Sequence, residues 1–152
     1  MGFRHSSIMD SGYRASVFEA DHNIADVIEI VVTTPAKGSY WLADDVVSHQ
    51  TVNVTLTEGV TIATAGEAMV FYARNRQGDW PDDCACLIER DDVDSSYTGG
   101  TEILTKVELR AEGGNHTLMK QSTSYLITVT SKADNNYTSV LVCVWEGSGT
   151  VM

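Results

Sequence analysis

Positive charge, cysteine and long apolar runs are all scarce in this sequence. Ten of its 152 residues are lysine or arginine, against twenty-one aspartates and glutamates, so the net charge is −11. Binding to nucleic acid depends on clustered basic side chains that release counterions, and the closest basic pair here is Arg74 and Arg76. No stretch approaches the ~18 apolar residues that indicate a membrane-spanning helix. We therefore expect neither nucleic acid nor a membrane to be a partner.

The three cysteines and four histidines are too few and too scattered for the common metal and thiol sites. Cys84 and Cys86 form a C-x-C pair and Cys143 is isolated, whereas structural zinc sites use C-x-x-C or closely spaced histidines. Acids near Cys84 and Cys86 favour the neutral thiol, which is the opposite of what a nucleophilic cysteine needs. We expect these two cysteines to be small core residues. An odd cysteine count and an N-terminus without a secretion signal favour folding in a reducing compartment.

Motifs of the common enzyme classes are missing as well. The sequence has no G-x-S-x-G elbow, no phosphate-binding G-x-x-x-x-G-K and no G-x-G-x-x-G. Adjacent acids occur at Asp44 and Asp45 and at Asp82 and Asp83. A glycosidase needs one acid in an apolar pocket beside a second that stays ionised, and the sequence selects no such pair. We predict that the chain is not an enzyme and has no catalytic residue, cofactor or metal.

What the sequence does have is a two-residue alternation, which predicts β-strands rather than helices. Residues 103–112 alternate an apolar face with a mainly charged one, and residues 51–57 alternate valine and leucine with threonine and asparagine. We expect the apolar face of each run to be buried; in the first run it comprises Ile103, Thr105, Val107, Leu109 and Ala111. The other expected strands are residues 14–19, 27–34, 39–42, 60–63, 68–74, 84–90, 125–130 and 137–145. Turn-forming residues 131–136 join the last two, which predicts a hairpin, and only residues 23–29 are a candidate helix.

These eight to ten short strands predict an all-β fold with little or no helix, an antiparallel β-sandwich or jelly-roll-like domain, with a barrel as the related alternative. Seventeen valines and sixteen threonines suit half-buried pleated surfaces. No repeat, low-complexity tract or linker divides the chain. We therefore expect one β-sandwich domain over residues 13–146, an N-terminal arm over residues 1–12 and a C-terminal tail over residues 147–152.

The expected arm has apolar side chains but no alternation. Phe3, Ile8 and Met9 are its apolar residues, and they cannot form a core by themselves. A segment of this kind is expected to lie on a neighbouring subunit or to fold back on its own domain, and both alternatives stay open. In the first case Phe3, Ile8 and Met9 are assembly contacts.

Negative charge is concentrated between Asp79 and Asp94, where seven acids and one arginine give a local charge of −6. The simplest interpretation is a solvated loop, and the alternative is a divalent-cation loop or a docking surface. An EF-hand that starts at Asp92 needs glycine sixth and glutamate twelfth, but Tyr97 and Ile103 stand there. Trp80 in the same segment offers a surface on which a sugar ring could stack. The alternative ligand loop comprises Asp79, Trp80, Asp82, Asp83, Asp92, Asp94 and Tyr97.

In general character the sequence resembles small accessory proteins of bacteriophage heads and tails, which are acidic, β-rich and rich in threonine, valine and glycine. This likeness is one of composition. It predicts a structural, non-catalytic virion protein, such as a capsid decoration or cement protein, that binds neighbouring protein subunits through strand edges and its terminal arm and forms a homo-oligomer. The location would be the virion, or otherwise the cytoplasm. The alternative function is a carbohydrate- or calcium-binding β-sandwich module that uses residues 79–94.

Overall fold

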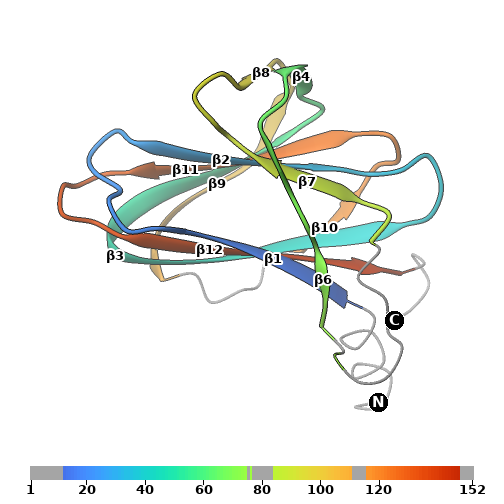
Figure 1. The fold of residues 1–152 in the computed structure, drawn as a ribbon, viewed down its shortest axis with the longest axis horizontal. Coiled ribbons are helices and arrows are strands. Elements are labelled where there is room, and N and C mark those ends of the chain that lie inside the picture. The colour runs from blue at the N-terminus through green and yellow to red at the C-terminus, as the bar shows by residue number, and fades with distance from the viewer. Residues whose placement is uncertain (1–11, 75, 77–83, 111–115, 148–152) are drawn as a thin grey trace.

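The computed structural model describes residues 12–74, 76, 84–110 and 116–147, and these form twelve strands and no helix. All strand pairings among them are antiparallel. The predicted all-β antiparallel class is confirmed, whereas the candidate helix at residues 23–29 is wrong, because this segment is a turn followed by a strand. Within the described residues no apolar helix reaches the length needed to cross a membrane. In chain order the strands are β1 (Gly12–Glu19), β2 (Val27–Thr33), β3 (Tyr40–Glu58), β4 (Thr61–Thr64), β5 (Glu67–Met69), β6 (Tyr72–Ala73), β7 (Leu87–Arg90), β8 (Ser96–Thr98), β9 (Thr101–Arg110), β10 (His116–Met119), β11 (Ser124–Ser131) and β12 (Thr138–Glu146) (Figure 1).

The 19-residue strand β3 organises the molecule. Its first half pairs with β12 and β10, and its second half pairs with β11 and β9. The sequence indicated two separate strands here, at residues 39–42 and 51–57. Residues 43–50 between them contain neither glycine nor proline, so nothing in the local sequence ends the strand, and β3 continues through both.

The main sheet follows the order β5-β7-β2-β11-β3-β12-β1-β6 and is strongly curled into a half-barrel. Figure 1 shows β2 and β11 in the upper part of the view and β12 and β1 in the lower part, with β3 curving between them. The expected sandwich needs two separate sheets, but β3 belongs to both parts of this one. The curled single sheet therefore replaces the clear sandwich that strand count alone suggested.

The predicted hairpin between residues 125–130 and 137–145 is wrong in its pairing, although both strands exist. β11 pairs with β2 and β3, and β12 pairs with β1 and β3. Both edges of each strand are therefore occupied, and β11 and β12 lie one after the other along β3. The connection over residues 132–137 carries the chain from one half of the curled sheet to the other.

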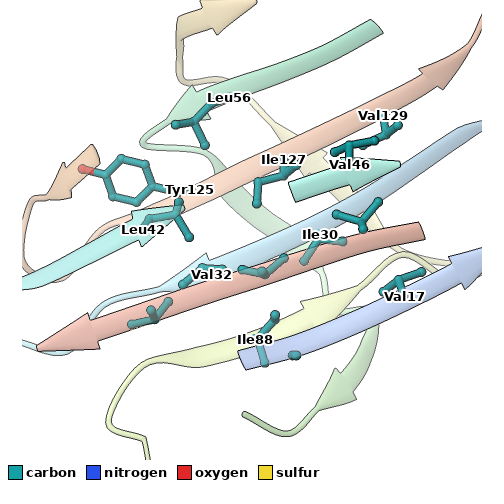
Figure 2. Close-up of a cluster of buried hydrophobic side chains, with 14 of the residues drawn as sticks. Val17, Ile30, Val32, Leu42, Val46, Leu56, Ile88, Tyr125, Ile127 and Val129 are labelled. Carbon is teal, nitrogen blue, oxygen red and sulfur yellow. The ribbon is translucent and has the colours of Figure 1, made fainter. Parts of the chain in front are cut away.

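Apolar side chains from both halves fill the inside of the curl (Figure 2). Val52, Val54 and Leu56 of β3 are buried there, as the alternation of residues 51–57 predicted. The buried residues that Figure 2 labels are Val17, Ile30, Val32, Leu42, Val46, Leu56, Ile88, Tyr125, Ile127 and Val129. A smaller cluster of Val31, Val60 and Leu126 packs with Ile62 of β4 and Tyr97 of β8, so the two-stranded β4–β8 sheet covers part of the outer surface.

Strand β9 exists as predicted, but it faces the opposite way. Ile103 and Val107 are 43% and 65% exposed, whereas Leu104 packs against the core. The reason is the register with β3, in which Leu104 lies opposite Leu56 and Lys106 lies opposite Val54. Cross-strand partners share a face of the sheet. Leu104 and Lys106 therefore point inward, as do the buried Leu56 and Val54 that they face. Of the predicted apolar face, Ile103, Thr105 and Val107 are therefore exposed, whereas the side chains of Leu109 and Ala111 lie outside the described part of the structure.

The expected arm and tail lie almost entirely outside the described residues. β1 already begins at Gly12, the last residue of the expected arm, and β12 ends at Glu146. Gly12 pairs with Trp145, so the described chain enters and leaves the sheet on adjacent strands. The predicted contacts Phe3, Ile8 and Met9 fall outside the described residues and stay a prediction.

Candidate interaction surface

The acidic turn after β7 is held together by its own side chains. Asp92 Oδ1 accepts hydrogen bonds from the backbone N–H groups of Asp94 and Ser95, both at 2.9 Å. The hydroxyl of Tyr97 donates to the Glu89 carboxylate at 2.9 Å, and burial together with this bond raises the pKa of Tyr97. Three of the seven residues of the alternative ligand loop are thus placed, and they stabilise the turn and its base.

The other four residues of that loop, Asp79, Trp80, Asp82 and Asp83, lie outside the described residues. In the part of the chain that the structure describes, no three His, Cys, Asp or Glu side chains come close enough to hold a metal ion. The loop therefore stays a prediction from the sequence.

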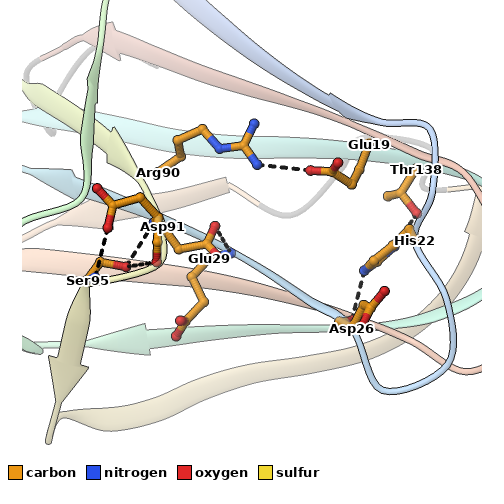
Figure 3. Close-up of polar contacts among 9 residues, drawn as sticks. Glu19, His22, Asp26, Glu29, Arg90, Asp91, Ser95 and Thr138 are labelled. Carbon is orange, nitrogen blue, oxygen red and sulfur yellow. Dashed lines mark hydrogen bonds and ion pairs between the residues drawn. The ribbon is translucent and has the colours of Figure 1, made fainter.

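The remaining acids near this turn take part in structural contacts, which Figure 3 shows. Arg90 of β7 forms an ion pair with Glu19 of β1 at 3.0 Å. Asp91 Oδ1 accepts the backbone N–H of Glu29 at 3.0 Å. Burial and the charge of Asp91 raise the pKa of Glu29. These carboxylates connect β1, β2 and β7 across the open side of the curl.

His22 is the one histidine that is buried among those described, and both of its ring nitrogens are occupied (Figure 3). Nε2 donates to the carbonyl oxygen of Asp26 at 2.9 Å, and Nδ1 lies 2.7 Å from the hydroxyl of Thr138. The ring therefore ties the turn between β1 and β2 to the start of β12. Both ring nitrogens are thus engaged in contacts within the chain.

Two of the three cysteines lie in or against the core. Cys86 is buried and Cys84 is half-buried. A hydrogen bond with Cys84, together with burial, raises the pKa of Cys86, and burial raises the pKa of Cys143. Cys86 belongs to the core and Cys84 packs against it, as the sequence predicted.

An ion pair between Lys106 and Asp44 lies inside the curl. Lys106 Nζ is 3.2 Å from Asp44 Oδ1, and the two side chains are only 12% and 11% exposed. The pair connects β9 to the first half of β3, so it bridges the two halves of the sheet. The adjacent cavity, which Asp44 lines with Leu104 and Ile127, measures about 10 Å³, which is room for about one water molecule. The pair is therefore structural and has no space for a substrate.

A second polar cluster joins β3 to the turn before β11. Glu58 forms an ion pair with the exposed Lys120 at 2.9 Å and accepts a hydrogen bond from the buried Tyr125 hydroxyl at 2.9 Å. These contacts lower the pKa of Glu58, the bond to Lys120 having the larger effect. Burial raises the pKa of Tyr125 to about 12.

A hollow lies on the surface along β1 and β6. It has a volume of about 720 Å³ and is lined by Arg14, Ser16, Tyr72, Arg76 and Leu141, together with Ala15, Met69, Val70 and Ala73. None of these lining residues is an acid, a histidine or a cysteine.

The feature that stands out is the outward surface of β9, defined as the side chains of Ile103, Thr105 and Val107 and the strand edge that faces away from β3. All three side chains are exposed. Among the described residues, β9 pairs with β3 and with no other strand. The β9 surface thus combines an apolar face with a row of backbone groups that no described strand pairs with, which is the chemistry of a site for strand addition.

Sequence reasoning missed this surface, since alternation identifies the two faces of a strand but not which one is buried. One signal was present in β3, where Asp44 alternates with the apolar Leu42 and Val46. A buried carboxylate needs a cation, and Lys106 on the charged face of β9 supplies it. No family model matches the chain, and no curated protein matches it. The functional argument therefore depends on the geometry alone.

Proposed function

We propose that the chain is a non-catalytic structural protein of a larger assembly, of the kind that decorates or cements a bacteriophage capsid. It works by binding neighbouring protein subunits through strand edges and its N-terminal arm, and its location is the virion. The observation that carries this proposal is the β9 surface, an apolar strand face beside an edge that no described strand pairs with.

The chemistry of the other described residues supports binding rather than catalysis. The buried ionisable groups Lys106, Asp44 and His22 all make structural contacts. The cavity beside the ion pair is too small for a substrate. The net charge of −11 keeps the rest of the surface hydrated and steers the chain away from nucleic acid. Stable subunit contacts bury about 1,200–2,000 Å² in total, so the β9 surface and the arm would act together.

The experiment is removal of the chain from the particle whose genome encodes it. Particles that lack the chain should lose resistance to heat or osmotic shock, and the purified chain should rebind to them in a fixed ratio, measured by quantitative mass spectrometry. A chain that is absent from purified particles, or that does not rebind, would overturn the proposal.

The role of the arm is tested in the same rebinding assay. A chain without residues 1–11, or with Ile8→Asp, should rebind more weakly because the apolar anchors are lost. Ser6→Asp, which adds the same charge at a polar position of the arm, is the matched control. Equal rebinding by all of these variants would remove the arm from the proposed contacts.

A further inference from the structure

We propose that Cys84 and Cys86 form a redox-sensitive site, in which the two thiols close reversibly into a disulfide by exchange with a small-molecule disulfide of the glutathione type. The inference goes beyond the proposed function and does not depend on it, because it concerns the chemistry of one bend of the chain and not its contacts with other subunits. It assigns a modification site where the sequence predicted only small core residues.

The first argument is the position of the two cysteines directly before β7. The sequence predicted a strand over residues 84–90, but β7 begins at Leu87, and Ala85 and Cys86 lie in a bend. On a straight strand alternate Cα atoms are ~6.6 Å apart, near the upper limit of about 6.8 Å for a disulfide. In the bend the Cys86 thiol forms a hydrogen bond with the Cys84 thiol. The two sulfur atoms therefore already face each other in the folded chain.

The second argument is that a reagent can reach the pair from one side. Both cysteines line a hollow of about 310 Å³ beside β5 and β7, together with residues that include Gly66, Met69 and Glu89. Cys86 is 3% exposed, whereas Cys84 is half-buried. Cys84 is therefore the thiol that a small disulfide meets first, and Cys86 is the more deeply placed of the two.

The exchange has two balanced steps. The Cys84 thiolate attacks one sulfur of the small disulfide, which forms a mixed disulfide and releases one thiolate. The Cys86 thiolate then attacks the Cys84 sulfur, which releases the second thiolate and leaves the protein disulfide. The two protein thiols are thus oxidised, the small disulfide is reduced to two thiols, and the two protons of the protein thiols pass to the leaving thiolates.

The surroundings of Cys86 explain why the second step follows the first. The hydrogen bond with Cys84 and burial raise the pKa of Cys86, and the charges of Cys84 and Glu146 add to this effect. Once Cys84 is bonded in a mixed disulfide, its sulfur carries no charge, so its share of the effect on the pKa of Cys86 is lost. Cys86 then ionises more readily, beside the sulfur that it attacks. The pair therefore stays as two thiols until a disulfide reaches Cys84.

The third cysteine serves as an internal control. Cys143 lies on β12, burial raises its pKa, and neither Cys84 nor Cys86 is among the described groups that act on it. Trypsin, which cleaves after lysine and arginine, leaves Cys84 and Cys86 together in peptide 77–90 and leaves Cys143 in peptide 133–152. Oxidation of the pair can therefore be measured separately from oxidation of Cys143.

The experiment is equilibration of the full chain with reduced and oxidised glutathione at about pH 8.5, near the ordinary pKa of a thiol, followed by acid quenching, trypsin digestion and mass spectrometry. Peptide 77–90 should lose the mass of two hydrogen atoms, while Cys143 forms no disulfide with either cysteine of the pair. The same measurement in urea tests whether the fold holds the two thiols together. We expect the equilibrium constant for disulfide closure to be at least tenfold larger in the folded chain, which lowers the reduction potential by about 30 mV.

The order of attack has its own test in two variants. Cys86→Ala should stop at a stable mixed disulfide on Cys84, because no second thiol is left to displace glutathione. Cys84→Ala should leave Cys86 as a free thiol in the folded chain. The matched control is Cys143→Ala, in which the pair should close as it does in the wild type.

A wild-type pair that stays as two thiols, or that stops at the mixed disulfide, would overturn the inference. Equal equilibrium constants in the folded and unfolded chains would overturn it as well, since the fold would then contribute nothing. A glutathione adduct on Cys86 in the Cys84→Ala variant would overturn the proposed order of attack. None of these results bears on rebinding of the chain to particles, so the two proposals can fail separately.

Discussion

Replacing Lys106 by methionine should destabilise the protein strongly, because it leaves the Asp44 carboxylate buried without its cation. At the 3.2 Å separation of the two groups, an effective dielectric constant of about 20 gives an attraction of about 5 kcal/mol. Removing one partner of a buried pair typically costs about 3–5 kcal/mol, and we expect about 3 kcal/mol here because β9 lies at an edge, where the carboxylate can recruit water. For a chain of this size that loss corresponds to a fall in Tm of about 6–12 °C.

The double variant Asp44→Leu with Lys106→Met distinguishes charge from packing. It replaces both charges by apolar groups of similar volume, so its free energy of unfolding should lie within about 1 kcal/mol of the wild type. Urea unfolding followed by tryptophan fluorescence measures all four corners of the cycle. Lys120→Met is the control, since Lys120 is 71% exposed in its ion pair and its loss should cost less than about 1 kcal/mol. The reasoning is refuted if Lys106→Met is as mild as this control, or if the double variant is as unstable as the sum of the single ones.

Three further outcomes follow from the contacts described. Gly66→Ala should lower the free energy of unfolding by about 3 kcal/mol, because the new Cβ would overlap the Arg90 carbonyl oxygen. The control Gly99→Ala places its Cβ in open space at φ +72 and should cost about 1 kcal/mol. Equal losses of the two variants in urea unfolding would contradict this prediction. Because the folded pKa of Glu58 lies below its ordinary value of 4.5, its stabilisation is complete above that value and is lost as the pH falls through the folded pKa. Thermal unfolding should therefore show the gap between wild type and Glu58→Gln shrinking from neutral to acidic pH, and a gap that widens would refute it. Cys86, whose pKa is raised, should react with iodoacetamide far more slowly in the native chain than in urea, and equal rates would show that its thiol is accessible.

The strands themselves could be predicted from the sequence because their signals are local. Residues 51–57 alternate valine and leucine with polar residues, and Val52, Val54 and Leu56 are buried as expected. The two runs near the C-terminus correspond to β11 and β12 within one residue at each end. Valine- and threonine-rich alternation specifies a pleated strand wherever it lies in the fold.

Pairing and facing could not be predicted, because they depend on partners far away in the sequence. The face of β9 is set by its register with β3, about fifty residues earlier, and a shift by one residue would exchange its two faces. Likewise, β11 and β12 resembled a hairpin because a turn joins them in the sequence. The strands that pair with them instead, β1, β2 and β3, lie far away in the sequence, so no local signal announced these pairings. The β9 surface could not be predicted for the same reason. The acidic loop was predicted as an alternative site because a concentration of charge can be read directly from the sequence.

The position of β12 between β3 and β1 has a consequence for synthesis of the chain. Of the described strands, β12 is made last, yet its two neighbours in the sheet begin at Gly12 and Tyr40. Until it arrives, the nascent chain holds β1 and the first half of β3 with a missing strand between them, which exposes two edges and their apolar faces. This protein therefore depends on late, long-range closure, and chaperones that shield nascent β-strands should raise its yield more than slower translation would.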